Sequence, residues 1–292
     1  MPTARVLAQA KVNLILRVLA REASGYHSIE TVFVRLDLSD LVRLRITNGR
    51  SLDCVGHAIP SSGLGPVEKN LGYRAAVAYA EAVGWPAGFA IEIEKRIPVG
   101  AGLGGGSADA GAVLRALDAM SPTPLGPRLI ELATSLGADV PFMTIESPMA
   151  LGWGRGERLF PLPVLIPRPG VSVVPNFAIS TPDAYGWVSA DRGPYAPAAE
   201  VIPPNSVATW EEIAAVASND FEPPVARRHP EIAEIVDILD SMDAIIAMLS
   251  GSGSTVCGIF AEAPDIGEIV RATGHSAVAT RTSDRVFRVE IE

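Results

Sequence analysis

The 292-residue sequence predicts a mixed α and β protein, because strand-like and helix-like patterns of apolar residues follow one another along the chain. Residues 4–20 are rich in Val, Leu and Ile and partly alternate with polar residues, which is typical of one or two strands. Residues 68–84 instead repeat apolar residues at near-helical spacing and stop at a glycine, which is typical of a helix.

The other elements are predicted from the same two patterns, and the chain is long enough for one large or two medium domains. Four prolines in residues 161–170 mark the best candidate boundary, so we expect domains at 1–160 and 161–292. In chain order we expect strands at 30–38, 40–46 and 88–94, helices at 105–120 and 128–137, a turn at 137–143, two strands in 149–162, a strand at 170–175, a loop at 180–208, helices at 209–217 and 230–242, two apolar segments around a Gly-Ser loop in 244–261, then a short helix and a strand.

The composition is that of a globular protein, with 48% apolar and 20% charged residues. A net charge of −9 argues against a nucleic-acid partner. The N-terminal segment is interrupted by Arg5, Lys11 and Arg17, and no apolar run has the length to span a bilayer, so we expect a cytoplasmic protein with no membrane partner. Two cysteines, Cys54 and Cys257, are too few for a disulfide framework or a cysteine metal cluster.

A glycine-rich stretch, IPVGAGLGGGSADAG at residues 97–111, stands between a predicted strand and a predicted helix. Five glycines in residues 100–106 allow backbone N–H groups to close around an anion, and the start of a helix adds free N–H donors. This order of strand, loop and helix indicates a phosphate site. A glycine turn needed only for tight packing is the alternative.

Two common phosphate loops do not fit these residues. A P-loop requires a lysine directly after the glycines, and none follows here. The dinucleotide fingerprint is matched in letters by Gly100, Gly102 and Gly105, but it requires a buried strand before it and an acidic residue about 20 positions on. Here the strand carries Glu92 and Glu94, and the later residues SPTPLGPR contain no acid.

A third kind of loop, PVGAGLGGGSADA, resembles the nucleotide motif of the GHMP kinase superfamily, which includes galactokinase, homoserine kinase and mevalonate kinase. The N-terminal stretch AQAKVNLILRV and the late loop LSGSGSTVCGIF are similar to two further motifs of the superfamily, in the same order. The stretches SGYHS, NLGYRAA, LGADVPF, GWGRGE and SNDFE resemble the branch that phosphorylates a cytidine diphosphate polyol of the non-mevalonate isoprenoid route with ATP.

The resemblance implies a two-domain α+β fold, with an N-terminal domain like ribosomal protein S5 domain 2, a ferredoxin-like C-terminal domain and the site between them. It also implies that Lys11 and Asp139 are the catalytic pair. Taken without the resemblance, Asp139 is typical of a turn cap and Lys11 of a solvated lysine. A lysine beside a carboxylate favours the charged form of that carboxylate.

ATP and Mg²⁺ are the expected cosubstrate and metal, and Ser107 is the candidate metal contact, directly or through water; its alternative is a helix cap. Asn13, one strand period from Lys11, is expected to hold the polyol. The resemblance further implies cytidine contacts from Tyr26, His27 and Tyr185. The remaining implied substrate contacts are Gly251, Ser252 and Gly253, and the implied ATP contacts are Asn70, Lys95, Pro98, Gly100, Ala101, Gly102, Leu103, Gly104, Gly105, Gly106, Ser107 and Asp109.

Three alternatives stay open on the sequence. Another GHMP kinase would act on homoserine or mevalonate, which do not need the aromatic residues of GYH and Tyr185. A Rossmann oxidoreductase would use the apparent dinucleotide fingerprint, and a non-catalytic regulator would not need both Lys11 and Asp139. We expect a monomer or a weak homodimer.

Overall fold

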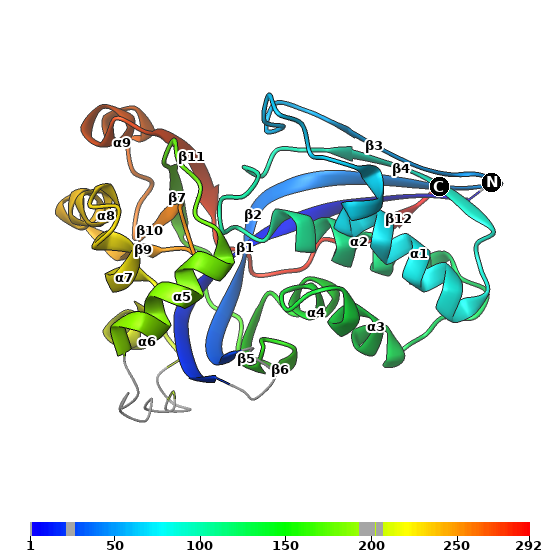
Figure 1. The fold of residues 1–292 in the computed structure, drawn as a ribbon, viewed down its shortest axis with the longest axis horizontal. Helices are drawn as coiled ribbons and strands as arrows, with labels where there is room; N and C mark the ends of the chain where they lie inside the picture. Colours follow the sequence, from blue (N-terminus) through cyan, green and yellow to red (C-terminus); the bar gives the residue numbers. More distant parts are fainter. Residues whose placement is uncertain (1, 22–26, 193–201, 203–206) are drawn as a thin grey trace.

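The computed structural model describes residues 2–21, 27–192, 202 and 207–292 (Figure 1). These residues form two sheets with helices packed on each, so the predicted mixed α and β class is confirmed. The long strands β1 (Thr3–Arg21) and β2 (His27–Thr47) run through the middle of the molecule and join its two halves.

The first sheet is built on the antiparallel pair β1 and β2. Its order is β12-β1-β2-β4-β3, with β5 paired to β2, β6 to β5 and β8 to β1. β2 is one continuous strand where the sequence predicted two. The other members are β3 (Arg50–Val55), β4 (Gly88–Glu94), β5 (Met149–Gly154), β6 (Arg158–Pro161), β8 (Ser218–Asn219) and β12 (Glu290–Ile291).

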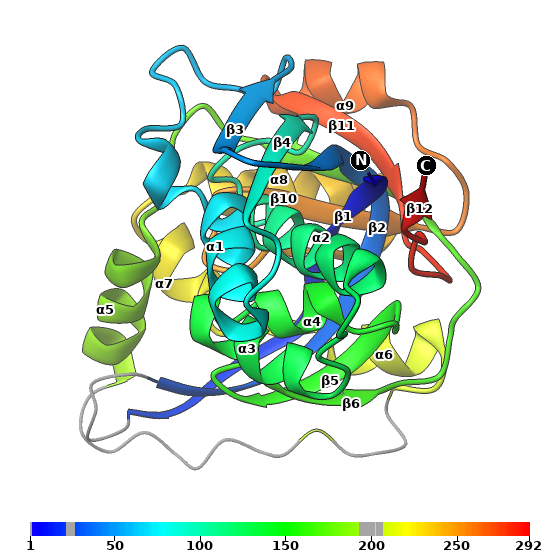
Figure 2. The ribbon, with the colours of Figure 1, turned by 90° about the vertical axis from the view of Figure 1, so that its right-hand side faces the viewer.

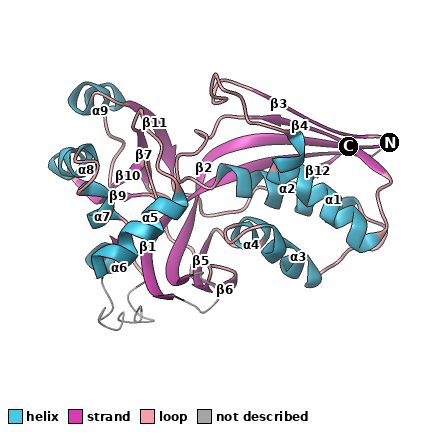
Figure 3. Cartoon of the chain, viewed as in Figure 1, coloured by secondary structure: helices cyan, strands magenta, loops and turns pink. Residues whose placement is uncertain are grey.

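Four helices cover one side of this sheet: α1 (Leu71–Val83), α2 (Gly105–Met120), α3 (Arg128–Leu136) and α4 (Val140–Thr144) (Figures 1 and 3). A single helical turn, η1 (Val67–Lys69), precedes α1. Asn70 caps α1 by accepting the N–H of Gly72, and Gly84 ends it with a left-handed φ of 73°. α2 lies next to α1 and packs on β1 (Figure 2), which fixes the glycine loop against the strand that carries Lys11.

The second sheet is antiparallel, in the order β11-β7-β10-β9. Its strands are β7 (Pro169–Val174), β9 (Ala244–Leu249), β10 (Val256–Phe260) and β11 (Ser276–Arg281). The helices of this half, which stand on the left of Figure 1, are α5 (Thr181–Arg192), α6 (Trp210–Val216), α7 (Glu222–Ala226), α8 (Glu231–Ser241) and α9 (Ile266–Thr273).

Two local predictions were wrong. Residues 181–192 form α5 rather than a loop, because the apolar side of this segment packs into the core of the second half. Pro182 is tolerated in the first helical turn, where its missing N–H costs nothing. Residues 140–144 form α4 rather than a turn, and Asp139 stands at its N-cap position.

The fold also bears on the dinucleotide hypothesis. β4, the strand before the glycine loop, pairs antiparallel with β2 and parallel with β3, so it lies in a mixed sheet rather than in the parallel sheet that a dinucleotide fold requires. The apparent fingerprint at Gly100, Gly102 and Gly105 is therefore accidental.

The second half of the chain contributes two short strands to the first sheet. β8 and β12, from the second half of the chain, pair with β1 in the first sheet, and the N- and C-terminal ends lie side by side there (Figure 1). The proposed division after residue 160 stays a prediction. Cys54 is half-buried and Cys257 buried, and both are free thiols. Within the described residues no helix is long and apolar enough to cross a membrane.

Candidate active site

A cavity of about 1690 Å³ is lined by residues from both halves of the molecule. It contains the start of α2, parts of β1 and β2, the residues before α4, one face of α5 and the loop between β9 and β10. Ten of the residues predicted from the sequence line it: Lys11, Asn13, His27, Gly102, Gly104, Ser107, Asp139, Tyr185, Gly251 and Ser252.

The predicted catalytic pair meets in this cavity. Lys11 Nζ lies 3.3 Å from Asp139 Oδ2 and donates a hydrogen bond of 2.7 Å to Asn13 Oδ1. The side chain of Lys11 is 5% exposed and that of Asp139 is 29% exposed. The buried ammonium, with two oxygen partners, holds the carboxylate in place, while the carboxylate itself stays open to the cavity.

Asn13 is fixed from its other end. Its amide nitrogen donates to Thr31 Oγ1 at 2.7 Å, and the Thr31 hydroxyl donates to the carbonyl of Ile15 at 2.7 Å. Asn13 Oδ1 is therefore the atom that faces Lys11. This chain of hydrogen bonds sets the orientation of the amide. Both its oxygen and its nitrogen already have partners within the protein.

The glycine loop begins α2 with unpaired N–H groups. Gly104 precedes the helix with a left-handed φ of 71°, and its carbonyl accepts the N–H of Ala108 at 2.8 Å. The N–H groups of the first turn therefore have no partner within the helix, and they lie at the positive end of its dipole. Ser107 lies in this turn and lines the cavity.

The second glycine loop, residues 250–253, docks directly on the first. The hydroxyl of Ser250 donates to the carbonyl of Gly102 at 3.2 Å, and a Cβ on Gly102 would overlap the carbonyl oxygen of Ser250. Asn219 Nδ2 donates to the carbonyls of Leu249 and Gly251 at 2.7 and 2.8 Å. Asn219 was not predicted as a site residue, although it stands in the quoted SNDFE stretch.

An aromatic pair, His27 and Tyr185, lines part of the cavity. The rings of His27 and Tyr185 stack with centroids 4.8 Å apart and planes 17° apart. His27 Nε2 also lies 3.1 Å from the hydroxyl of Ser189 on α5. Burial and the charge of Asp139 raise the pKa of Tyr185 to about 12. Tyr26, the other predicted aromatic contact, lies outside the described residues.

Comparison with known proteins decides the family. The model of the GHMP kinases N terminal domain matches residues 70–147, and that of the GHMP kinases C terminal domain matches residues 202–276. A 4-diphosphocytidyl-2-C-methyl-D-erythritol kinase of Pelotomaculum thermopropionicum is 40% identical over 286 residues, which cover 94% of this chain and 96% of that protein. The chain belongs to this kinase family.

Other members of the 4-diphosphocytidyl-2-C-methyl-D-erythritol kinase family agree. One from Thermus thermophilus is 40% identical over 94% of this chain and 95% of its own. A crystal structure of a 4-(cytidine 5′-diphospho)-2C-methyl-D-erythritol kinase superposes with a TM-score of 0.78 at 36% identity, covering 96% of this chain and 99% of that one. The two-domain GHMP kinase fold and the class of ATP-dependent phosphotransferase are confirmed.

The homoserine kinase and mevalonate kinase alternatives are disfavoured. A homoserine kinase structure from Cytophaga hutchinsonii has a TM-score of 0.68 at 16% identity, covering 99% of this chain and 97% of that one. At that identity the likeness shows the fold alone. The family membership also excludes the oxidoreductase hypothesis.

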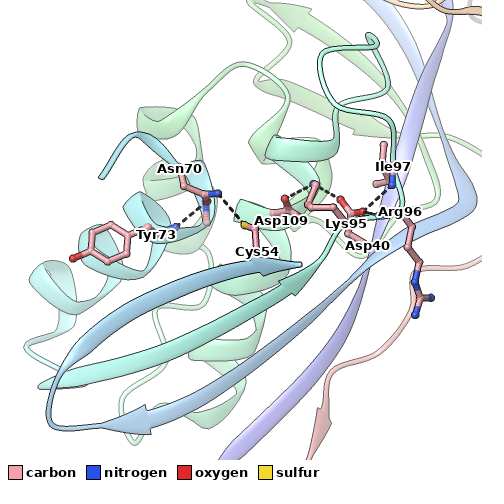
Figure 4. A network of polar contacts seen from close by, with 9 residues as sticks. Asp40, Cys54, Asn70, Tyr73, Lys95, Arg96, Ile97 and Asp109 are labelled. Carbon is pink, nitrogen blue, oxygen red and sulfur yellow. Dashed lines mark hydrogen bonds and ion pairs between the residues drawn. The ribbon is translucent and has the colours of Figure 1, made fainter. Parts of the chain in front are cut away.

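Lys95 and Asp109, predicted as ATP contacts, lie in a buried ion cluster (Figure 4). Lys95 Nζ pairs with Asp40 on β2 and lies 2.6 Å from Asp109 Oδ2 on α2. The other oxygen of Asp40 accepts the N–H groups of Arg96 and Ile97, at the start of the glycine loop. The cluster ties β2, the loop and the first turns of α2 together.

The charge of this cluster is not balanced, since two carboxylates share one ammonium. Burial, the first cause, and the charge of Asp40 raise the pKa of Asp109 to about 8. Asp109 Oδ1 is buried without a hydrogen-bond partner among the described residues. Neither Lys95 nor Asp109 lines the cavity, so their placement supports a role in holding the loop rather than direct contact with ATP.

Asn70 lines a separate, smaller pocket of about 270 Å³ beside Cys54. Its Nδ2 lies 3.7 Å from the Cys54 sulfur, and its Oδ1 is used as the α1 cap. The remaining predicted residues do not line the main cavity. Ala101, Leu103 and Gly253 are buried, Pro98 and Gly105 are partly buried, and Gly100 and Gly106 are exposed.

Proposed function

We propose that this chain transfers the γ-phosphoryl group of ATP to the 2-hydroxyl of 4-diphosphocytidyl-2-C-methyl-D-erythritol, in the synthesis of non-mevalonate isoprenoid precursors. The names of its relatives support this substrate. One observation carries the proposal: a charged pair, Lys11 and Asp139, lies in the cavity that also holds a helix N-terminus suited to phosphate.

The phosphates of ATP would lie at the N-terminus of α2. The free N–H groups of the first helical turn donate to the phosphate oxygens, and the helix dipole favours their negative charge. Ser107 adds a hydroxyl at the same place. The smaller pocket beside Asn70 and Cys54 is the candidate place for the nucleoside part.

The acceptor hydroxyl would lie against Asp139. Its oxygen attacks the γ-phosphorus, the bond from that phosphorus to the bridging oxygen breaks, and ADP leaves with the electron pair. Asp139 Oδ2 accepts the hydroxyl proton as the new O–P bond forms. Lys11, 3.3 Å away, keeps the carboxylate in place and offsets charge that gathers on the transferred group.

The cytidine end of the substrate would occupy the region of His27 and Tyr185. An aromatic ring supplies a stacking face for a nucleobase, and imidazole nitrogens supply hydrogen bonds. We propose that cytosine replaces part of the stack between these two rings. Gly251 lies next to Lys11, and the hydroxyl of Ser252 lies 3.0 Å from that of Thr181 on α5, so we propose that these two residues contact the diphosphate.

The described part of the site offers few protein ligands for Mg²⁺. Among the described residues, no three His, Cys, Asp or Glu side chains converge to bind a metal ion. Mg²⁺ commonly keeps several waters and is held by substrate phosphates. We therefore propose Mg²⁺ bound with ATP, with Ser107 as its protein contact, directly or through water. A cytoplasmic monomer or weak homodimer is proposed as well.

The test is a steady-state assay of ADP release with purified protein, ATP, Mg²⁺ and the cytidine diphosphate polyol. The proposal predicts turnover with this acceptor and none above background with homoserine or mevalonate. Turnover on one of those alcohols, with none on the cytidine substrate, would overturn it.

A further inference from the structure

Arg35, in the middle of β2, is a buried guanidinium that the catalytic scheme does not use. Its side chain is among the largest fully buried ones, at 1% exposure. The Nη2 atom donates to the carbonyls of Phe142 at 2.6 Å and Ile145 at 3.0 Å, and the Nε atom donates to the carbonyl of Ser147 at 3.1 Å. The Nη1 atom lies 3.9 Å from the sulfur of Met143.

These acceptors all belong to the segment that begins at Asp139. α4 spans five residues, which is too short for a helix to be stable without tertiary contacts. The last carbonyls of any helix lack partners within it, and a cation there interacts favourably with the helix dipole. Arg35 supplies both the donors and the positive charge at this end, while Asp139 stands at the other.

The register of the first sheet places Arg35 directly beside the second catalytic residue. Arg35 and Lys11 are paired across β1 and β2. The strand pair therefore carries Lys11 on β1 and, on β2, Arg35, which holds the segment that begins at Asp139. Since sheet pairing fixes these strands relative to each other, Arg35 sets where Asp139 stands relative to Lys11.

α4 is also pressed against the phosphate-binding helix. A Cβ on Gly111 of α2 would lie 2.7 Å from backbone atoms of Met143, so only glycine allows this approach. Arg35 holds α4 and the residues after it by its carbonyl contacts. A shift of α4 away from Arg35 would move Asp139, and it would also loosen the packing of α4 on α2.

Burying the charge of Arg35 costs folding free energy, because Arg35 has no carboxylate within ion-pair distance among the described residues. Burial lowers the pKa of Arg35 to about 9, and the nearby Arg115 adds to this. A buried charge without an ion partner is a weak source of stability. Its guanidinium, however, presents donors in a rigid fork that fixes several carbonyls at once.

We propose that Arg35 is a positioning residue, which anchors the carbonyl end of α4 to β2 and thereby holds Asp139 in reach of Lys11 and the acceptor hydroxyl. This inference rests on the proposed kinase function. Arg35 contacts neither nucleotide nor acceptor in this scheme. Its loss should therefore slow the chemical step while the binding of both substrates stays close to normal.

The test compares Arg35→Met, Arg35→Lys and a control, Arg115→Met, in steady-state assays. Arg115 is a partly buried arginine on α2 that likewise donates to a carbonyl, that of Phe287. For Arg35→Met we expect kcat to fall about 100-fold, the effect of a small misplacement of a catalytic group, with both KM values within about threefold. Arg35→Lys should lose about tenfold, because an ammonium cannot span all three carbonyls. Arg115→Met should keep kcat.

Combination with Asp139→Asn separates positioning from general stability. If Arg35 acts through Asp139, the double variant Arg35→Met, Asp139→Asn has about the same kcat as Asp139→Asn alone. The proposal would be overturned if the fold losses in kcat of the two single variants multiply in the double variant. It would also be overturned if Arg35→Met lowers the melting temperature but leaves kcat unchanged. If Arg35→Met does not fold, Arg35→Lys decides: wild-type kcat in that variant overturns it. Absence of turnover in the wild-type protein would instead refute the proposed function.

Discussion

Lys11 and Asp139 form an ion pair in which the lysine side chain is buried and the aspartate side chain is partly exposed. Their charged atoms are 3.3 Å apart, yet the lysine side chain is 5% exposed and the aspartate side chain is 29% exposed. The ammonium is almost buried at the wall of the cavity, whereas the carboxylate is open to the cavity. An acceptor hydroxyl can therefore approach Asp139 without displacing Lys11, which is the arrangement that proton transfer during phosphoryl transfer requires.

The contact between the two glycine loops is predicted to matter for substrate binding. In Gly102→Ala, the new methyl group overlaps the Ser250 carbonyl, so residues 250–253 must move. We expect KM for the cytidine substrate to rise about tenfold or more, measured by ADP release at saturating ATP, which corresponds to about 1.4 kcal/mol of binding.

A control separates this contact from backbone strain. Gly84 ends α1 with a left-handed φ of 73°, close to the 77° of Gly102, and a Cβ there would meet nothing within 4 Å among the described residues. Gly84→Ala should cost about 1 kcal/mol of stability with unchanged KM. Equal KM values in the two variants would contradict the loop contact.

Tyr185 is predicted to bind the cytosine ring. Stacking of a base on an aromatic side chain contributes about 1–3 kcal/mol. Tyr185→Ala should therefore raise KM for the cytidine substrate between about 5-fold and about 150-fold, while KM for ATP stays within about twofold. Phe160→Ala is the control, because Phe160 is an exposed aromatic residue that does not line the cavity. A rise in KM for ATP alone would contradict the assignment.

The ion cluster of Lys95, Asp40 and Asp109 predicts a dependence of stability on pH. The pKa of Asp109 is raised from 3.8 to about 8, so the folded state holds a proton that the unfolded state releases. Stability from this group is complete below about pH 4 and is lost as the pH rises toward about 8. The slope of the unfolding free energy is at most about −1.4 kcal/mol per pH unit.

Asp109→Asn removes the titrating group and keeps the shape of the side chain. Urea unfolding at several pH values should show the variant gaining stability relative to the wild type as the pH rises from about 5 to about 8. A constant difference between the two proteins over this interval would show that Asp109 keeps its ordinary ionisation in the folded state.

The sequence predicted the parts of the molecule that depend on local patterns. Alternating apolar residues placed β1 and β4, and apolar spacing with a closing glycine placed α1. The glycine loop at the start of α2 was predicted from its residue types. Helix α5 was mistaken for a loop because Pro182 and Gly186 are helix breakers at most positions, and only the tertiary packing of its apolar side favours a helix.

Contacts between distant residues were out of reach of such patterns. Lys95 has the sequence context of an exposed strand end, and its pairing with Asp40, 55 positions away, arises only when β4 lies beside β2. Arg35 likewise appears as a polar residue in an alternating strand. Its role depends on carbonyls of α4 and of the residues just after it, 107 to 112 positions later in the chain. Neither pairing has a local signal.

The central claim is that this chain phosphorylates the cytidine diphosphate polyol with Asp139 as the proton acceptor. The most direct measurement is kcat for ADP release with this substrate, for the wild-type protein and for Asp139→Asn, with folding of both checked by circular dichroism. We predict turnover in the wild type and a loss of about 10²–10⁴ in kcat for the folded variant. Equal kcat in the two proteins, or no turnover in the wild type, would contradict the claim.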